Sequence, residues 1–286
     1  MNRLITENDQ KNLARYTAMI ASHMKASRDA GHDQQTIAEY RAMMLAINPY
    51  KYPPGYKPAA VASYTPKLQL KPGLTAAVAI PEGKGPFPTI IHAHGHGLRA
   101  GRPPEYEPWM REMASYGFVV MFPDYRWQPE ASFDDQMDDM LYAIDWAKKN
   151  GTRISCDPNR MIIGGDSAGG GLAIALLMKT MADPDGPRFV ALECVDGSIG
   201  GPRENQRILD QITSDTPLPP IIMMVGSSDA GPLAQAANAS LTFLKSKKNF
   251  ELFVYYGMPH DFMKFPGLDI MHVANADMMT WLKKVV

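Results

Sequence analysis

A serine flanked by glycines is the strongest chemical feature of the sequence. The segment Gly165-Asp166-Ser167-Ala168-Gly169 follows an apolar run and precedes a run of small residues with helical character. A serine in such a strand-to-helix turn is held in a strained conformation, and the flanking glycines remove Cβ atoms that would collide with neighbouring backbone. The turn lifts the Ser167 hydroxyl to a helix N-terminus, where the dipole favours developing negative charge. The pattern predicts a nucleophilic serine, and a turn with a solvated serine is the alternative.

A serine nucleophile needs a base to remove its proton and a carboxylate to orient that base. In an architecture of this kind the acid and then the histidine follow the serine along the chain, each after a late strand. Asp229 directly follows a predicted strand, and His260 lies just beyond the next one. The other histidine after Ser167, His272, falls inside a helical pattern. We therefore expect Asp229 and His260 to complete a triad with Ser167.

Two further aspartates compete with Asp229 for the orienting role. Asp261 is adjacent to His260, and we expect its side chain to point elsewhere. Asp215 lies in a loop rich in proline and threonine, ahead of the predicted strand rather than after it. Asp229 remains the expected orienting carboxylate.

Three histidines at a spacing of two, His92, His94 and His96, raise the alternative of a metal site. Residues two apart on a strand share one face, so three imidazoles there could hold zinc. The aspartate of an HxHxDH pattern is missing, because Gly95 and Gly97 flank His96, and the histidines further along are assigned to the triad or to a helix. No metal is therefore expected. The same loop lies where a serine hydrolase needs backbone N–H donors for an oxyanion.

The elements that must position these residues alternate between strands and helices. Apolar runs bounded by glycine, proline or aspartate predict strands at residues 74–80, 89–94, 118–122, 160–165, 190–195, 221–225 and 251–256. Helical patterns lie at residues 106–116, 133–149, 168–181, 233–247 and 270–285. This alternation predicts an α/β fold with a mostly parallel sheet covered by helices on both faces.

The N-terminal part of the chain differs from the rest. Apolar residues recur at intervals of three and four in two stretches, the first containing Tyr16 and Ile20 and the second Ile37 and Tyr40, which predicts two amphipathic helices. The segment 48–60 is rich in proline and tyrosine and is the predicted linker. We expect a helical cap segment at residues 1–50 and a catalytic domain at residues 51–286.

Composition and charge narrow the class of protein. A chain of 286 residues that is 45% hydrophobic and 21% charged can bury a full core. Its net charge of −1 gives no electrostatic footprint for nucleic acid, and neither a signal peptide nor a membrane-spanning run is recognisable. The two cysteines, Cys156 and Cys194, indicate buried thiols rather than disulfides. A cytoplasmic protein is the default expectation, and monomer and homodimer both remain open.

Several of these motifs together resemble the hormone-sensitive-lipase-like family of α/β-hydrolases. The motifs are HGHG at residues 94–97, DYRWQPE at 124–130, GDSAGG at 165–170, Asp229, and PHDF around His260. The resemblance covers roughly residue 74 to the C-terminus. It implies the α/β-hydrolase fold, a helical cap, no cofactor, and cleavage of small esters, mostly of short acyl chains. It also implies an oxyanion hole made by the N–H groups of Gly95, His96 and Ala168.

The sequence departs from the family pattern at three places. His96 replaces a glycine of the oxyanion loop, and histidine tolerates a positive φ better than most side chains. The stretch between Ser167 and Asp229 is shorter than usual, which predicts a cap made mostly of the N-terminal helices and a more open site. Gly171 replaces a common asparagine, a change expected to be minor.

The resulting expectation is a carboxylesterase-type serine hydrolase. A lactonase, an amidase or a thioesterase could use the same triad. A non-catalytic binder of small molecules on the same fold is the alternative from another class, and the presence of His260 disfavours it.

Overall fold

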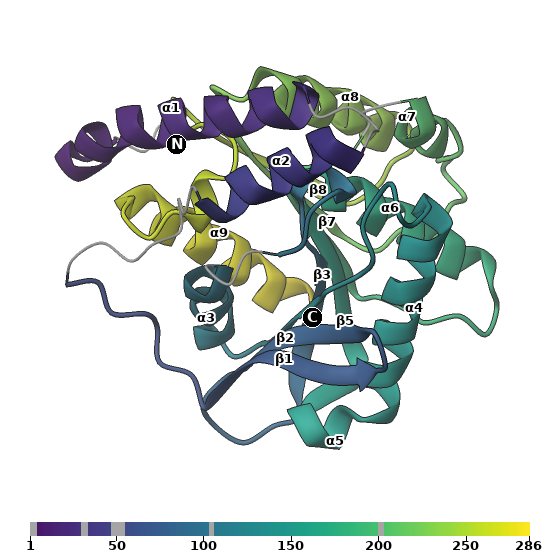
Figure 1. The fold of residues 1–286 in the computed structure, drawn as a ribbon. Coiled ribbons are helices and arrows are strands. Elements are labelled where there is room, and N and C mark those ends of the chain that lie inside the picture. The colour runs from purple at the N-terminus through teal and green to yellow at the C-terminus, as the bar shows by residue number, and fades with distance from the viewer. Residues whose placement is uncertain (1–4, 30–33, 47–54, 103–105, 200–202) are drawn as a thin grey trace.

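The computed structural model describes residues 5–29, 34–46, 55–102, 106–199 and 203–286 (Figure 1). Within these ranges the chain forms an eight-stranded sheet in the order β1-β2-β4-β3-β5-β6-β7-β8. The strands are β1 (Ser63–Lys71), β2 (Leu74–Ile80), β3 (Phe87–Ala93), β4 (Val119–Pro123), β5 (Cys156–Asp166), β6 (Ala191–Val195), β7 (Ile221–Gly226) and β8 (Phe250–Tyr255).

Most neighbouring strands of the sheet are parallel. β1 pairs antiparallel with β2, and β2 pairs antiparallel with β4. Every neighbouring pair from β4 to β8 is parallel. The carboxyl ends of the parallel strands therefore meet at one edge of the sheet, which is where ligand sites of open α/β sheets form.

Helices cover both faces of the sheet. The helices of the described residues are α1 (Glu7–Asp29), α2 (Gln34–Ala46), α3 (Glu107–Ser115), α4 (Phe133–Lys149), α5 (Gly151–Ile154), α6 (Ala168–Ala182), α7 (Arg203–Asp210), α8 (Ala230–Lys245) and α9 (Asp269–Val285), with short 3-10 helices η1 (His96–Leu98) and η3 (Phe262–Lys264). Side chains alternate between the faces along each strand. Ile91 and Met121 pack with residues of α4 and α6, whereas Ile90 and Val120 pack with residues of α3 and α9.

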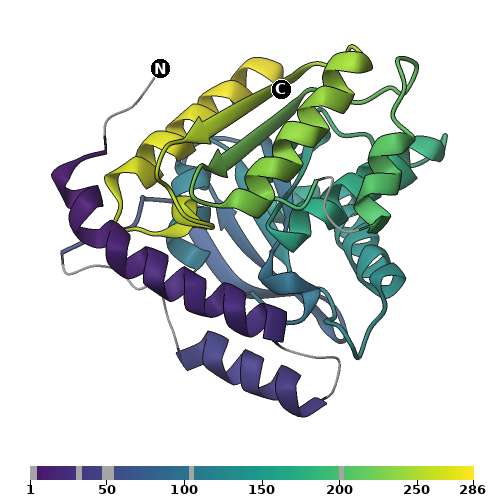
Figure 2. The ribbon, with the colours of Figure 1, turned by 90° about the horizontal axis from the view of Figure 1, so that it is seen from above.

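The two N-terminal helices lie side by side against the body of the protein (Figure 2). The ring of Tyr16 on α1 stacks on Phe265, with 4.5 Å between ring centroids. On α2, the guanidinium of Arg41 donates to the carbonyl of Arg99 at 2.7 Å and pairs with Glu130 at 2.8 Å. Helix α1 thus contacts the loop that follows β8, and helix α2 contacts the loop that follows β3.

The predicted burial of the N-terminal helices is confirmed where the structure describes it. Tyr16, Ile20, Ile37 and Tyr40 are all buried. The first part of the predicted linker, residues 48–54, lies outside the described residues. The division into a cap segment and a catalytic domain stays a prediction. No helix in the described ranges is both long and apolar enough to span a bilayer.

The predicted alternation of strands and helices is confirmed, with shifts at the ends of elements. β2 and α4 begin and end where predicted, and β5 begins four residues earlier. Of the strands and α-helices in the described residues, β1, α5 and α7 were not predicted, and neither were the short helices η1 and η3. β1 is an edge strand with mostly exposed or half-buried residues, so it lacks the continuous apolar run that identified the other strands.

Candidate active site

Ser167 occupies the tight turn between β5 and α6. Its backbone has φ 51° and ψ −125°, which is strained for a residue with a side chain. A Cβ atom on Gly165 would lie 2.3 Å from the carbonyl oxygen of Gly169, and one on Gly169 would lie 2.0 Å from the carbonyl oxygen of Ala93. Only glycine fits either position, as the sequence predicted, and the turn holds the Ser167 side chain at the carboxyl edge of the sheet.

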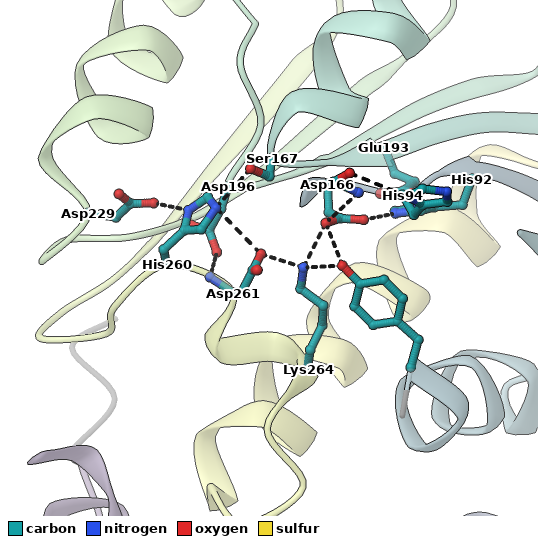
Figure 3. A network of polar contacts seen from close by, with 12 residues as sticks. His92, His94, Asp166, Ser167, Glu193, Asp196, Asp229, His260, Asp261 and Lys264 are labelled. Atoms are coloured by element: carbon teal, nitrogen blue, oxygen red, sulfur yellow. Dashed lines mark hydrogen bonds and ion pairs between the residues drawn. The ribbon is translucent and has the colours of Figure 1, made fainter. Parts of the chain in front are cut away.

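The three predicted triad residues lie together (Figure 3). His260 follows β8, and its Nε2 lies 2.9 Å from the Oγ of Ser167. Asp229 follows β7, and its Oδ2 lies 2.5 Å from the Nδ1 of His260. The histidine and the aspartate are both buried. In the neutral form of His260, Nδ1 donates to Asp229 and Nε2 carries no proton, so Nε2 can accept the one from Ser167.

Carboxylates surround His260 and favour its charged form. Burial alone would lower the pKa of His260, but the charge of Asp261 and the hydrogen bond to Asp229 raise the pKa to about 10, with a further contribution from Asp196. Both oxygens of Asp196 accept backbone hydrogen bonds, from Gly226 and from Asp261, each at 2.9 Å. The site is therefore built to stabilise an imidazolium.

The expectation that Asp261 points elsewhere is wrong. Its backbone has a φ of 64°, and one carboxylate oxygen lies 3.7 Å from the Nε2 of His260. The same oxygen pairs with the ammonium of Lys264. Adjacency in sequence gave no information about this orientation, because the left-handed backbone at Asp261 turns the side chain toward the imidazole.

The loop after β3 carries two of the three predicted oxyanion donors. His96 has a φ of 63°, so histidine adopts the conformation expected for the glycine it replaces. Gly95, in contrast, donates its N–H to the Oδ2 of Asp166 at 3.1 Å. Its N–H is thereby engaged inside the protein, which argues against the predicted role of Gly95 as an oxyanion donor. The third predicted donor, Ala168, is the first residue of α6, and η1 packs against that helix.

The three histidines of the triplet have three different environments. His92 lies between two buried carboxylates, with its Nε2 2.8 Å from Asp166 and its Nδ1 paired with Glu193. His94 stacks on Tyr125, with 4.3 Å between centroids. The ring of His96 stacks on that of Tyr106, at 5.5 Å.

The triplet does not form a set of metal ligands. Among the described residues, the His, Cys, Asp and Glu side chains close enough to share an ion are Asp196, His260 and Asp261, whose ligand atoms lie within 4.8 Å of one another. That group encloses the base of the triad, and Asp196 already accepts two backbone N–H groups.

Comparisons with known proteins agree with this geometry. Residues 90–195 match a family profile described as alpha/beta hydrolase fold. The chain has the α/β-hydrolase fold. A solved hormone-sensitive lipase from a metagenome library superposes on this chain with a TM-score of 0.75 at 20% identity, covering 99% of both chains. An esterase from the bacterial hormone-sensitive lipase family gives 0.73 at 22% identity, covering 96% of this chain and 98% of the other.

Curated relatives match the chain over a shorter stretch. Carboxylesterase NlhH of Mycobacterium tuberculosis strain H37Rv is 31% identical over 105 residues, covering 36% of this chain and 33% of the relative. The hormone-sensitive lipase of Mus musculus is 30% identical over 118 residues, covering 41% of this chain and 15% of the relative. The chain thus matches a third or less of the length of these two relatives. The predicted resemblance to hormone-sensitive-lipase-like α/β-hydrolases is confirmed.

Proposed function

We propose that this α/β-hydrolase is a serine esterase that cleaves carboxylic esters through an acyl-enzyme on Ser167. The observation that carries the proposal is the continuous hydrogen-bonded series from Ser167 through His260 to Asp229, with distances of 2.9 and 2.5 Å. The names of the matched relatives, a carboxylesterase and a hormone-sensitive lipase, support the same class of reaction.

The proposed reaction begins with proton transfer to His260. As the Oγ of Ser167 attacks the ester carbonyl carbon, Nε2 takes its proton, and Asp229 stabilises the resulting imidazolium. His260 then donates that proton to the leaving alkoxide, which departs as an alcohol. Water, deprotonated by His260, attacks the acyl carbon; the bond to Oγ then breaks, His260 returns the proton to Ser167, and the carboxylic acid is released. No metal or cofactor takes part in these steps.

We assign stabilisation of the oxyanion to the N–H groups of His96 and Ala168. Ala168 begins α6, whose N-terminal dipole favours negative charge at this point. Gly95 supports the loop instead, since its N–H is bound by Asp166. The backbone of His96, rather than its imidazole, is the functional part of that residue in this proposal.

The proposed substrates are esters of short acyl chains. This preference rests on the family resemblance, and the contacts of α1 and α2 with the loops after β8 and β3 support a role for these helices at the rim of the site. A cap built from residues 1–50 is part of the same proposal.

A panel of p-nitrophenyl esters of increasing acyl length tests the proposal. We expect hydrolysis of the short esters, and a loss of at least about 10³-fold in kcat for Ser167→Ala with the fold unchanged by circular dichroism. Ser240→Ala is the matched control, because that hydroxyl bonds a carbonyl within α8, away from the triad. A chain that binds these esters without turnover, or a Ser167→Ala variant with full activity, contradicts the proposal. Amide, lactone and thioester analogues in the same panel define the leaving group.

A further inference from the structure

A fully buried lysine lies next to the triad. Lys264 in η3 has no exposed surface, and its ammonium lies 2.7 Å from the Oδ2 of Asp166, 3.0 Å from the hydroxyl of Tyr106, and in contact with a carboxylate oxygen of Asp261 (Figure 3). The ammonium donates hydrogen bonds to Asp166 and Tyr106, and it forms an ion pair with Asp261. A buried ammonium without such partners would strongly destabilise the fold, so these oxygens are needed to keep Lys264 buried and charged.

Asp166 connects this lysine to the loop after β3. Its Oδ2 accepts the N–H of Gly95 at 3.1 Å and the hydroxyl of Tyr106 at 3.1 Å, in addition to the ammonium of Lys264. Its Oδ1 lies 2.8 Å from the Nε2 of His92. Asp166 directly precedes Ser167 in the tight turn and binds the loop that carries His96 through the N–H of Gly95. The ammonium of Lys264 therefore contacts a residue that is linked to both the nucleophile and that loop.

Asp261 connects the same lysine to the base. The oxygen that pairs with Lys264 is also the one 3.7 Å from the Nε2 of His260, the nitrogen that must accept and return the proton. The N–H of Asp261 donates to Asp196 at 2.9 Å, which fixes the peptide between His260 and Asp261. The negative charge of Asp261 is therefore held on the side of the imidazole that faces Ser167.

We propose that Lys264 is a positioning residue for the ester hydrolysis described above. Its buried ammonium clamps the Asp261 carboxylate beside the Nε2 of His260 and the Asp166 carboxylate against the N–H of Gly95. One cation thereby fixes the base and the loop after β3 relative to Ser167. The expected effect of Lys264 on catalysis rests on the proposed function. Its expected effect on the titration of His260 rests on the geometry alone.

The charges around His260 determine in which direction its pKa moves when one of the charged groups is removed. The groups that face the imidazole or its partners come from the loop after β8 (Asp261, Lys264), the end of β6 (Asp196), the start of α8 (Asp229) and the end of β5 (Asp166). Burial alone would lower the pKa of His260, and Asp261 contributes most to raising it. Loss of Asp261 should therefore lower that pKa, and loss of the nearby cation should raise it.

The test measures the titration of His260 by NMR in protein with ¹⁵N-labelled histidine, together with kcat and KM on a short p-nitrophenyl ester. Asp261→Asn keeps the shape of the side chain and should move the His260 midpoint to lower pH. Lys264→Met should move it to higher pH and lower kcat about 10- to 100-fold with little change in KM. In the double variant the effect of Lys264→Met on the midpoint should shrink, because it acts through Asp261.

Arg188→Met is the matched control. That arginine binds four backbone carbonyls near the C-terminal end of α6, at the opposite end of β6 from the triad. It should lower stability without moving the His260 midpoint. If the midpoint of the His260 titration is the same in wild type and Asp261→Asn, the inference is overturned. This comparison does not require Lys264→Met to fold. A wild type that cleaves no ester overturns the proposed function instead, since the NMR titration needs no turnover.

Discussion

Three buried histidines show how strongly surroundings set the chemistry of one side-chain type. Burial, together with the neighbouring His96, lowers the pKa of His94 to about 3. Burial would also lower the pKa of His92, but the charges and hydrogen bonds of Glu193 and Asp166 raise it to about 9. His260 is raised further, to about 10. His94 is thus a neutral packing residue, His92 is a structural cation, and His260 is the proposed base.

The activity of the free enzyme should rise with pH. His260 accepts a proton only in its neutral form, and with a pKa of about 10 that fraction grows about tenfold per pH unit below this value. We expect kcat/KM for a short ester to increase from neutral pH toward pH 10, after subtraction of spontaneous hydrolysis. A profile with a midpoint near 6.5, the ordinary value for histidine, contradicts the assigned environment of His260.

The sequence predicted the three triad residues but not the charges that surround them. Ser167, Asp229 and His260 could be found because each follows a strand in a fixed order along the chain. Glu193 could not, because its partner His92 lies far away in the sequence. Lys264 could not, because Asp261 is near it in the chain but Tyr106 and Asp166 meet it only after the sheet forms. The sequence offered one indication of a buried lysine: Lys264 stands between Met263 and Phe265, in an apolar segment that follows His260.

At the scale of elements, the turn between β5 and α6 depends on close approach of backbones. The start of α6 lies so near the end of β3 that a Cβ atom on Gly169 would meet the carbonyl oxygens of Ala93 and His94, at 2.0 and 2.7 Å. Neither oxygen can move without disturbing the sheet or the loop after β3. The turn, the strand and the loop therefore form one rigid unit around Ser167.

Substitution of Gly169 by alanine should cost about 3 kcal/mol of folding free energy, because the added methyl group overlaps backbone. Gly231→Ala is the matched control, since that glycine lies in the first turn of α8 with no atom within 4 Å of the added Cβ. We expect it to be neutral or to stabilise by about 0.5 kcal/mol. Urea unfolding of both variants gives the comparison, and equal stabilities refute the tight approach at Gly169.

The strand that the sequence did not predict, β1, was missed for a physical reason. β1 pairs with β2 at the edge of the sheet and contains Pro66 and several exposed polar side chains. Leu68 and Leu70 pack against the core, but polar residues separate them and the strand has no continuous apolar run of the kind that identified the other strands. The central strands are buried on both sides and were predicted for that reason.

At the scale of the whole molecule, a buried series of alternating charges crosses the centre of the structure. It runs from Glu193 through His92, Asp166, Lys264 and Asp261 to His260 and Asp229. These residues come from strands β3, β5 and β6 and from the loops after β7 and β8. The fold and the site are therefore coupled through electrostatics as well as through packing.

This coupling should make stability fall at alkaline pH. The pKa of His92 is raised in the folded protein, from 6.5 to about 9, so its contribution is complete below pH 6.5 and is lost as pH rises through about 9. We expect His92 to contribute a drop on the order of 3 kcal/mol in the free energy of unfolding in urea across this window, and His260, whose pKa is also raised, to add to it. His272→Gln, at a half-exposed histidine paired with Glu112, should retain the drop. A stability that is flat or rises from pH 6.5 to 9 contradicts the assigned pairing of His92.

The central claim is that Ser167 is a nucleophile activated by His260 and Asp229. The most direct measurement is intact-protein mass spectrometry after reaction with a fluorophosphonate, followed by peptide mapping. We expect a single adduct on Ser167 in wild type and Ser240→Ala, slower labelling in Asp229→Asn, and no adduct in Ser167→Ala. Labelling of Ser167→Ala at the wild-type rate, or ester hydrolysis that persists after complete labelling, would contradict it.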